Sequence, residues 1–304
     1  MEAFELTNEV ADSERKLLPG VRAALDRPTD ERIVLTKTEV WIDYLNAKLA
    51  INAMNDLLMH PRAEEMPGLL IAAESRNGKS SLLRKFQQDH LANMGEGGRL
   101  NMPVVRLRMP DKPDPGAFWT AVLNAMKVGH QVKAPVPVKK DQAQRTLANV
   151  RCRMLMIDEI HNILQGKAPE QRHFLALLKN LSSELMMPIV AAGTVNALRA
   201  LHTEKELGDR FEVVGLSKWE LDRSLRSLLK SLEETLPLRE PSGLDEREIA
   251  TRLFDASGGT IGGLCNIVRA AAVHGIRTGE ERITTKTLDT LHFKPLRTFD
   301  VRAL

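Results

Sequence analysis

The chain has 304 residues, of which 43% are hydrophobic and 27% are charged, so it can bury a core and is not a disordered tail. No stretch approaches the ~18 consecutive apolar residues that a membrane span needs, and residues 1–16 lack the apolar run of a secretory signal. The net charge of +3 is too small to establish nucleic-acid binding and too small to exclude it. Cys152 and Cys265 are too few for a disulfide framework, so we expect reduced, buried thiols in a cytosolic protein.

Residues 1–66 are predicted to form a helical N-terminal lead-in. Apolar residues recur every fourth position in its second half and would line one face of a helix, which ends at Pro61. The residues of that predicted face are Leu45, Leu49, Ala53 and Leu57.

Residues 67–218 are predicted to form an α/β core. Short apolar runs alternate with helix-length segments, and the helix over 174–185 has one strongly apolar face. Because strands separated by helices form parallel sheets, we expect a parallel sheet flanked by helices on both sides. The five predicted strands are 68–72, 104–107, 154–157, 188–192 and 211–214.

Residues 219–290 are predicted to form a small all-helical lid, because strand-like runs stop after Trp219 and leucines recur at helical spacing. A glycine-rich turn at 258–263 precedes a further helix. Residues 291–304 are expected to be a C-terminal tail, and the proline-rich stretch 134–137 an exposed loop.

The sequence after the first predicted strand matches a phosphate-binding loop, with Ala73 in place of the first glycine. Gly78 would let the backbone approach a phosphate, Lys79 would reach the terminal phosphates of ATP, and Ser80 would bind Mg²⁺. Arg76 is expected to point outward. The predicted nucleotide-binding residues are Ser75, Arg76, Asn77, Gly78, Lys79, Ser80 and Ser81.

Two carboxylates follow the third predicted strand and suit phosphoryl transfer. Asp158 is predicted to hold Mg²⁺ together with Ser80, and Glu159 to polarise the attacking water. His161 is expected to begin a helix rather than to act in catalysis.

Thr194 and Arg210 are the remaining catalytic candidates. Thr194 ends the next strand and would orient the water, although a threonine that caps a helix gives the same pattern. An arginine at the position of Arg210 would reach the nucleotide of a neighbouring subunit in an oligomeric ATPase. A surface salt bridge with Asp209 or Glu212 is the alternative.

These motifs occur in the order of an AAA+ ATPase. In its detailed sequence, the stretch from Trp41 to Leu291 resembles the transposition ATPases of the TniB/TnsC family. The Gly-Lys-Ser loop and the Ile-Asp-Glu strand are shared with every AAA+ protein. Two other stretches are more specific to this family, namely His60-Pro61-Arg62 and Gly259-Thr260-Ile261-Gly262.

The resemblance implies a bacterial cytoplasmic protein that binds ATP and oligomerises on double-stranded DNA as a ring or helical filament, without sequence preference. It implies recruitment of a transposase for target-site selection, together with a TniQ-type targeting protein. Related ATPases carry an arginine at the start of the lid helix, where this chain has Gly262 and Gly263, with Arg269 almost two turns on. We therefore expect ATP hydrolysis to be slow and dependent on assembly.

The charge is unevenly distributed along the chain. Residues 1–33 hold eight acids and five bases and are expected to bind a protein partner, whereas residues 133–153 hold six bases and one acid. The basic region is typical of a polyanion footprint, but an ordinary solvated loop is the alternative. The resemblance implies that DNA is contacted by four lysines of this chain, Lys112, Lys133, Lys139 and Lys140.

Two other functions share these motifs. A replication initiator or helicase loader has the same core, although a winged-helix domain is then expected after the lid, where this chain has only residues 291–304. A signalling NTPase whose nucleotide state controls protein partners alone would bind no DNA.

Overall fold

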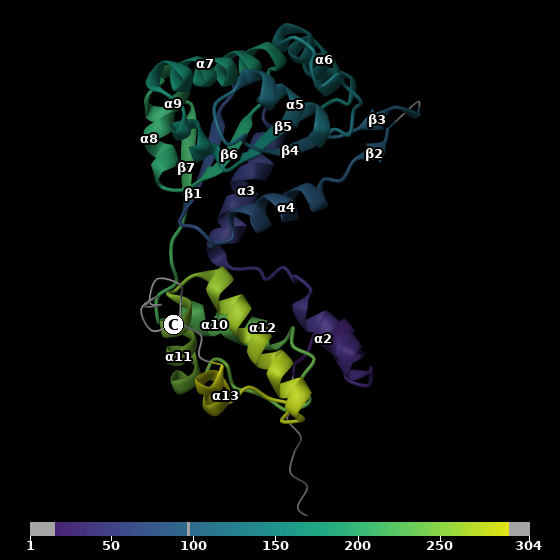
Figure 1. Ribbon diagram of the computed structural model, residues 1–304, viewed down its shortest axis with the longest axis vertical. Coiled ribbons are helices and arrows are strands. Elements are labelled where there is room, and N and C mark those ends of the chain that lie inside the picture. Colours follow the sequence, from purple (N-terminus) through teal and green to yellow (C-terminus); the bar gives the residue numbers. More distant parts are fainter. Residues whose placement is uncertain (1–15, 96–97, 292–304) are drawn as a thin grey trace, which may run out of the picture. The chain divides into compact units, whose positions relative to one another are not determined.

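The computed structural model describes residues 16–95 and 98–291, which divide into two compact units. The larger unit is Asp43–Lys218, and the smaller one combines the described residues up to Ile42 with those from Trp219 onward (Figure 1). The predicted division into lead-in, core, lid and tail stays a proposal. The structure assigns the two main helices of the predicted lead-in to different units. The predicted tail lies, apart from Leu291, outside the described residues.

The larger unit is built on a five-stranded parallel sheet, as predicted. Its strand order is β4-β5-β6-β1-β7, and the three inner strands are buried along their whole length, as expected of a sheet covered on both faces. Each predicted strand is present, with ends that differ by at most two residues. The strands are β1 (Gly68–Ala73), β4 (Val104–Arg108), β5 (Met154–Asp158), β6 (Ile189–Gly193) and β7 (Phe211–Leu216).

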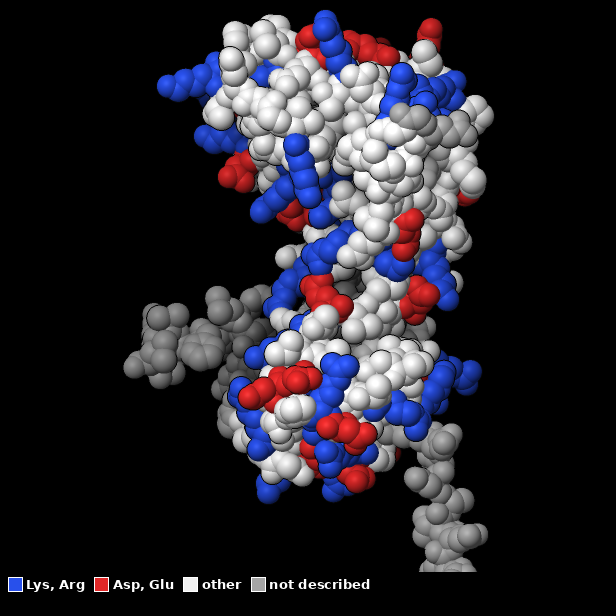
Figure 2. Space-filling view, turned by 90° about the vertical axis from the view of Figure 1, so that its right-hand side faces the viewer, with Lys and Arg blue, Asp and Glu red and all other residues white. Residues whose placement is uncertain are grey.

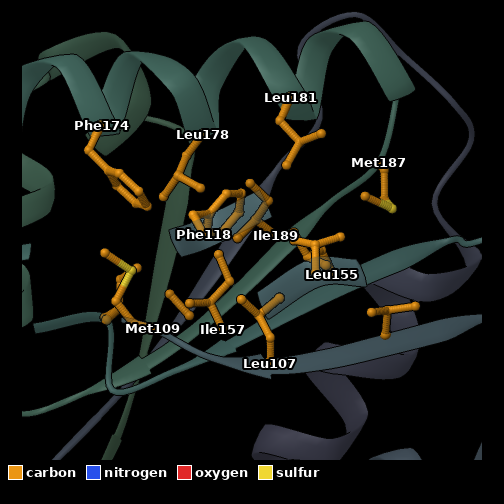
Figure 3. Close-up of a cluster of buried hydrophobic side chains, with 14 of the residues drawn as sticks. Leu107, Met109, Phe118, Leu155, Ile157, Phe174, Leu178, Leu181, Met187 and Ile189 are labelled. Atoms are coloured by element: carbon orange, nitrogen blue, oxygen red, sulfur yellow. The ribbon is translucent and has the colours of Figure 1, made fainter. Parts of the chain in front are cut away.

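Helices cover both faces of this sheet (Figure 1). The helices α3 (Leu45–Met59) and α4 (Lys79–Asp89) pack on one face, and α5 (Pro115–Ala125), α6 (Val136–Asn149), α7 (Ala168–Leu185) and α8 (Asn196–His202) pack on the other. Side chains of α7 point onto the sheet in Figure 3, where Phe174, Leu178 and Leu181 face Leu155 and Ile189. The remaining elements are the 3₁₀ helix η2 (Ile160–Gln165), α9 (Lys205–Gly208), and a small exposed hairpin of β2 (Asn93–Met94) and β3 (Leu100–Asn101).

The buried face of α3 is not the face that the regularly spaced leucines line. Leu45 is 72% exposed and Leu49 is 53% exposed, whereas Ala47, Ala50 and Met54 are fully buried against the sheet. The small alanine side chains let the helix backbone lie close to β1 and β7, which leucines at those positions would prevent. Apolar spacing predicted the helix, but close packing selected the other face.

The smaller unit is all-helical. It comprises α1 (Pro19–Arg22), α2 (Thr29–Lys37), α10 (Arg223–Glu233), α11 (Arg247–Ser257), α12 (Ile261–Thr278) and α13 (Thr285–Thr290) around a leucine-rich core. Thr260 caps α12 by accepting a hydrogen bond from Gly263 N, and Ile33 of α2 lies in the same core. In neither unit does a described helix combine the length and the apolar character that crossing a membrane requires.

Candidate functional site

The loop between β1 and α4 has the backbone geometry of a phosphate cradle. Arg76 and Gly78 both have left-handed φ values, 62° and 88°, which turn the chain sharply before α4 begins at Lys79. The first turn of a helix carries unpaired N–H groups and a positive dipole end, so this turn suits an anion. Arg76 is exposed, as predicted.

Two side chains of the loop attach it to the end of β7 and to the two residues that follow. Asn77 is 2% exposed, and its Nδ2 donates to Leu216 O at 2.7 Å and to Ser217 O at 2.8 Å. Glu74 pairs with Lys218 Nζ at 2.9 Å. Asn77 therefore has a part in shaping the loop that the sequence pattern did not reveal, because its carbonyl partners are 139 and 140 residues away.

The ammonium group of Lys79 lies inside the loop. Its Nζ donates to Ala73 O at 2.9 Å and to Glu74 O at 2.8 Å, and the residue is 5% exposed. Burial lowers the pKa of Lys79, and the negative charges of Glu159, Asp158 and Glu74 oppose that effect. An additional anion in the loop would stabilise the charged form of this lysine.

The strand order brings Asp158, Glu159 and Thr194 to the same edge of the sheet as the phosphate loop. Strand β6 lies between β5 and β1, so Thr194 lies between the acidic pair and the phosphate loop. Asp158 is 5% exposed and accepts a hydrogen bond from Glu159 N at 3.0 Å. The backbone of Glu159 adopts the left-handed helical conformation, with φ 58° and ψ 36°. This conformation costs a non-glycine residue on the order of 1 kcal/mol or more.

His161, expected only to begin a helix, lies in η2 and also contacts the candidate catalytic residues. Its Nε2 is 3.3 Å from Glu159 Oε2, and its Nδ1 accepts from Thr194 N at 3.4 Å. The Asp-Glu-Ile-His spacing was visible in the sequence, but the backward turn of the chain after Glu159 was not.

Arg210 lies at the opposite edge of the sheet. Its carbonyl accepts from Gly68 N at 2.8 Å, at the start of β1, so the length of β1 separates it from the phosphate loop by about 20 Å at ~3.3 Å per residue. Its guanidinium contacts Ser183 Oγ at 3.2 Å and Glu65 Oε1 at 3.4 Å, rather than Asp209 or Glu212. It therefore has no access to the phosphate loop of its own chain.

The four lysines predicted to contact DNA lie in different surroundings. Lys112 and Lys133 are exposed, in the loops before α5 and α6. Lys139 is 8% exposed and donates to Thr120 Oγ1 at 3.0 Å, and Lys140 pairs with Glu184 at 3.2 Å. DNA contact stays a prediction for all four, and exposure favours Lys112 and Lys133.

The basic region 133–153 is not a continuous positive patch. Helix α6 begins at Val136, inside the stretch expected to be a loop, and Arg145 pairs along it with Asp141 at 2.9 Å. Arg153 donates to Leu58 O and His60 O. On the face drawn in Figure 2, basic and acidic side chains are interspersed.

The residues present fit a nucleotide and Mg²⁺. Backbone N–H groups and Lys79 suit phosphates, and the Ser80 hydroxyl and the Asp158 carboxylate are the oxygen ligands that Mg²⁺ accepts alongside phosphate and water. The described residues contain no group of three or more His, Cys, Asp and Glu that could hold a metal without a nucleotide.

The sequence matches the family model described as bacterial TniB protein over residues 32–221. No curated protein matches it.

Among solved structures, the match to the Aeropyrum pernix ORC2 protein in ADPNP and ADP complexes covers 89% of this chain and 74% of that one, at 13% identity and a TM-score of 0.62. The match to the Aeropyrum pernix ORC1 protein in complex with DNA covers 85% and 68%, at 14% identity and a TM-score of 0.59. Cdc6p of Pyrobaculum aerophilum matches over 84% and 68%, at 13% identity and a TM-score of 0.58. These likenesses confirm the predicted AAA+ fold class.

Proposed function

Because the chain belongs to the TniB family and has the AAA+ fold, we propose that it is an ATP-dependent DNA-binding regulator of transposition. The observation that supports this most strongly is the grouping of the phosphate loop, Asp158, Glu159 and Thr194 at one edge of the sheet. That grouping supplies the parts of phosphoryl transfer that a P-loop ATPase needs.

ATP binding rests on the loop and on Lys79. The loop N–H groups and the ammonium of Lys79 bind and orient the phosphates, and anchoring by Asn77 and Glu74 keeps the loop shaped for them. Ser80 and Asp158 would hold Mg²⁺, which would supply positive charge to balance the negative charge that develops on the phosphate oxygens.

Hydrolysis rests on Glu159 and Thr194. The Glu159 carboxylate accepts a proton from the attacking water, and the Thr194 hydroxyl orients that water. The buried Asp158 is committed to the metal, so the two neighbouring carboxylates have separate tasks.

Arg210 makes activity depend on assembly. Its place at the far edge of the sheet suits contact with the nucleotide of a neighbouring subunit, where it stabilises transition-state charge. The bond to the mostly exposed Glu65 is weak enough to be exchanged on assembly. The active form is therefore a ring or helical filament.

In this proposal the assembly forms on double-stranded DNA, and the exposed Lys112 and Lys133 contact phosphates without reading sequence. The partners are a transposase and a TniQ-type targeting protein. Family membership and the DNA-bound ORC1 structure with the same fold support this reading.

A replication initiator or helicase loader is the second candidate, favoured by the likeness to ORC and Cdc6 proteins. The family match favours transposition. ATP-dependent stimulation of strand transfer by a transposase encoded beside this chain would support the first candidate, and loading of a replicative helicase without such stimulation would support the second.

The test of the enzyme function is ATP turnover by the purified chain with Mg²⁺, with and without duplex DNA. Lys79→Ala should abolish ATP binding, and with it assembly of that variant by itself. Glu159→Gln should bind ATP as tightly as the wild type but lower turnover by roughly 100-fold or more, and so trap the ATP-bound assembly. Normal turnover by Glu159→Gln would show that Glu159 does not activate the water.

A further inference from the structure

We propose that His161 is a positioning residue that holds the Glu159 carboxylate in register with Thr194. The proposal deepens the ATPase function above and rests on it. His161 lies two residues after Glu159 in sequence, and its ring reaches the end of a different strand, β6, at Thr194. It thus joins the two residues assigned to the attacking water.

The two contacts of His161 specify how its ring is protonated. Thr194 N–H can only donate, so Nδ1 must accept and carries no proton. In that tautomer Nε2 carries the proton and donates it to Glu159 Oε2, which as a carboxylate can only accept. One neutral imidazole therefore satisfies both partners, and neither contact competes with the other.

The backbone around His161 is held by three strand ends. Ile160 is completely buried, and Gly193 lies so close that a Cβ there would be 2.9 Å from Ile160 Cγ2 and 3.4 Å from His161 N. Asn162 Nδ2 donates to Met109 O at 3.3 Å, which ties the same turn to the end of β4. The imidazole is thus a fixed support rather than a mobile surface group.

Glu159 needs such a support. Its left-handed backbone turns the chain out of β5, and its side chain is 30% exposed, so packing alone does not restrict its rotamer. The charge-assisted bond from His161 selects one orientation of the carboxylate, beside Thr194. Both of these partners belong to the water-activating part of the site and neither to the phosphate loop.

Loss of His161 should therefore slow hydrolysis without weakening ATP binding. In steady-state assays on duplex DNA, we expect His161→Ala to lower kcat by roughly 10–100-fold, because a misplaced catalytic group costs rate, and to leave KM for ATP within about twofold. The control is His173→Ala, which removes an exposed histidine of α7 and should change neither parameter.

Two conservative variants separate positioning from folding. The amide nitrogen of Gln takes the place of Nε2 and can donate to Glu159, so His161→Gln should recover most of the lost kcat. Asn reaches only the place of Nδ1, so His161→Asn should keep the contact with Thr194 but remain slow. Equal activity of the Gln and Asn variants would overturn the proposal.

A double-mutant cycle provides the decisive comparison. If His161 acts through the Glu159 carboxylate, His161→Ala should have little further effect on kcat in a Glu159→Gln background. An additive loss would overturn the proposal, as would a wild-type kcat for His161→Ala in a chain that hydrolyses ATP. Absence of turnover in the wild-type assembly on DNA would instead overturn the proposed ATPase function itself, and this inference with it.

Discussion

At the scale of single residues, Gly193 sets how closely η2 approaches the end of β6. An added Cβ would lie 2.9 Å from both Ala197 Cβ and Ile160 Cγ2, which is closer than packed carbon atoms tolerate. Both neighbours are completely buried, so neither has space to move away. The hydrogen bond from Thr194 to His161 depends on this approach.

We expect Gly193→Ala to lower the free energy of unfolding by about 1–3 kcal/mol, as overpacking does in a dense core. It should also slow ATP turnover, because η2 and its histidine move away from Thr194. Denaturant unfolding and a turnover assay measure the two effects. The matched control is Gly215→Ala on β7, where the added Cβ meets no atom within 4 Å. Equal stability of the two variants would contradict the packing argument.

Residues whose place in the fold follows from local spacing could be located from the sequence, and their roles stay predictions. The phosphate loop and the acidic pair belong to this class, because each is read within a few positions of a strand. The contacts of His161 and the burial of Lys139 could not be predicted, since they depend on Thr194 and Thr120, which belong to other elements. The partners of a side chain are set by how elements pack, which spacing along one element does not report.

At the scale of elements, Arg32 attaches α2 to the segments that follow α10 and α12 in the smaller unit. Its Nη1 donates to Glu281 Oε1 at 2.9 Å, its Nη2 also pairs with Glu281 Oε2, and its Nε donates to Pro237 O at 3.1 Å. The arginine side chain is 4% exposed, so the pair is largely removed from water. Burial raises the pKa of Glu281, but the hydrogen bonds and charges of Arg32 and Arg239 together outweigh it and lower that pKa below its ordinary value.

Arg32→Ala should destabilise the docking of α2 by about 3 kcal/mol, because it leaves a largely buried carboxylate without its partner. Faster hydrogen exchange of the α2 and α12 amides would show this.

A carboxylate with a lowered folded pKa contributes stability above its unfolded pKa of ~4.3 and loses it as pH falls through the folded value. Wild-type protection should therefore decrease below pH ~4, and the variant should lack that decrease. A variant with the wild-type pH profile would contradict this role.

The type of each element was easier to predict than the face it buries. Strand positions followed from apolar runs, and the parallel sheet followed from their alternation with helices. The spacing of leucines along α3 indicated the helix but not its buried face, where Ala47 and Ala50 allow the closer approach. Helix α6 begins within a proline-rich stretch because proline is tolerated in the first turn of a helix.

At the scale of the whole molecule, the residues proposed to act in ATP hydrolysis lie at two opposite edges of one sheet. The phosphate loop and Glu159 lie at the carboxyl ends of the strands, and Arg210 lies at the start of β7. No rearrangement within the sheet brings these together. If Arg210 acts on a nucleotide, as proposed, it therefore acts on that of a second copy of the chain.

Mixed assemblies test this requirement. Lys79→Ala removes phosphate binding but keeps Arg210, and Arg210→Ala does the reverse, so each variant alone should be nearly inactive. Mixed on duplex DNA, the two should recover a measurable fraction of wild-type turnover, because an intact loop can face an intact arginine. A mixture no more active than the sum of its parts would contradict action of Arg210 across subunits.

Exposed lysines of the larger unit should contribute to DNA affinity through phosphate contacts alone. Lys112→Ala and Lys133→Ala should weaken binding equally for unrelated duplex sequences, and each should reduce the slope of log affinity against log salt by about 1. Lys139→Ala is the matched comparison, since its ammonium is bonded to Thr120. A loss of affinity that varies with DNA sequence would contradict phosphate contact.

In the proposed function, the chain binds DNA of any sequence only when ATP occupies this site. The most direct measurement is fluorescence anisotropy of labelled duplexes of unrelated sequence, titrated with the chain in a non-hydrolysable ATP analogue with Mg²⁺, in ADP, and without nucleotide. We expect tight, cooperative binding only with the ATP analogue, equal for all duplexes and lost in Lys79→Ala. Binding that is independent of nucleotide, or no binding in any state, would contradict it.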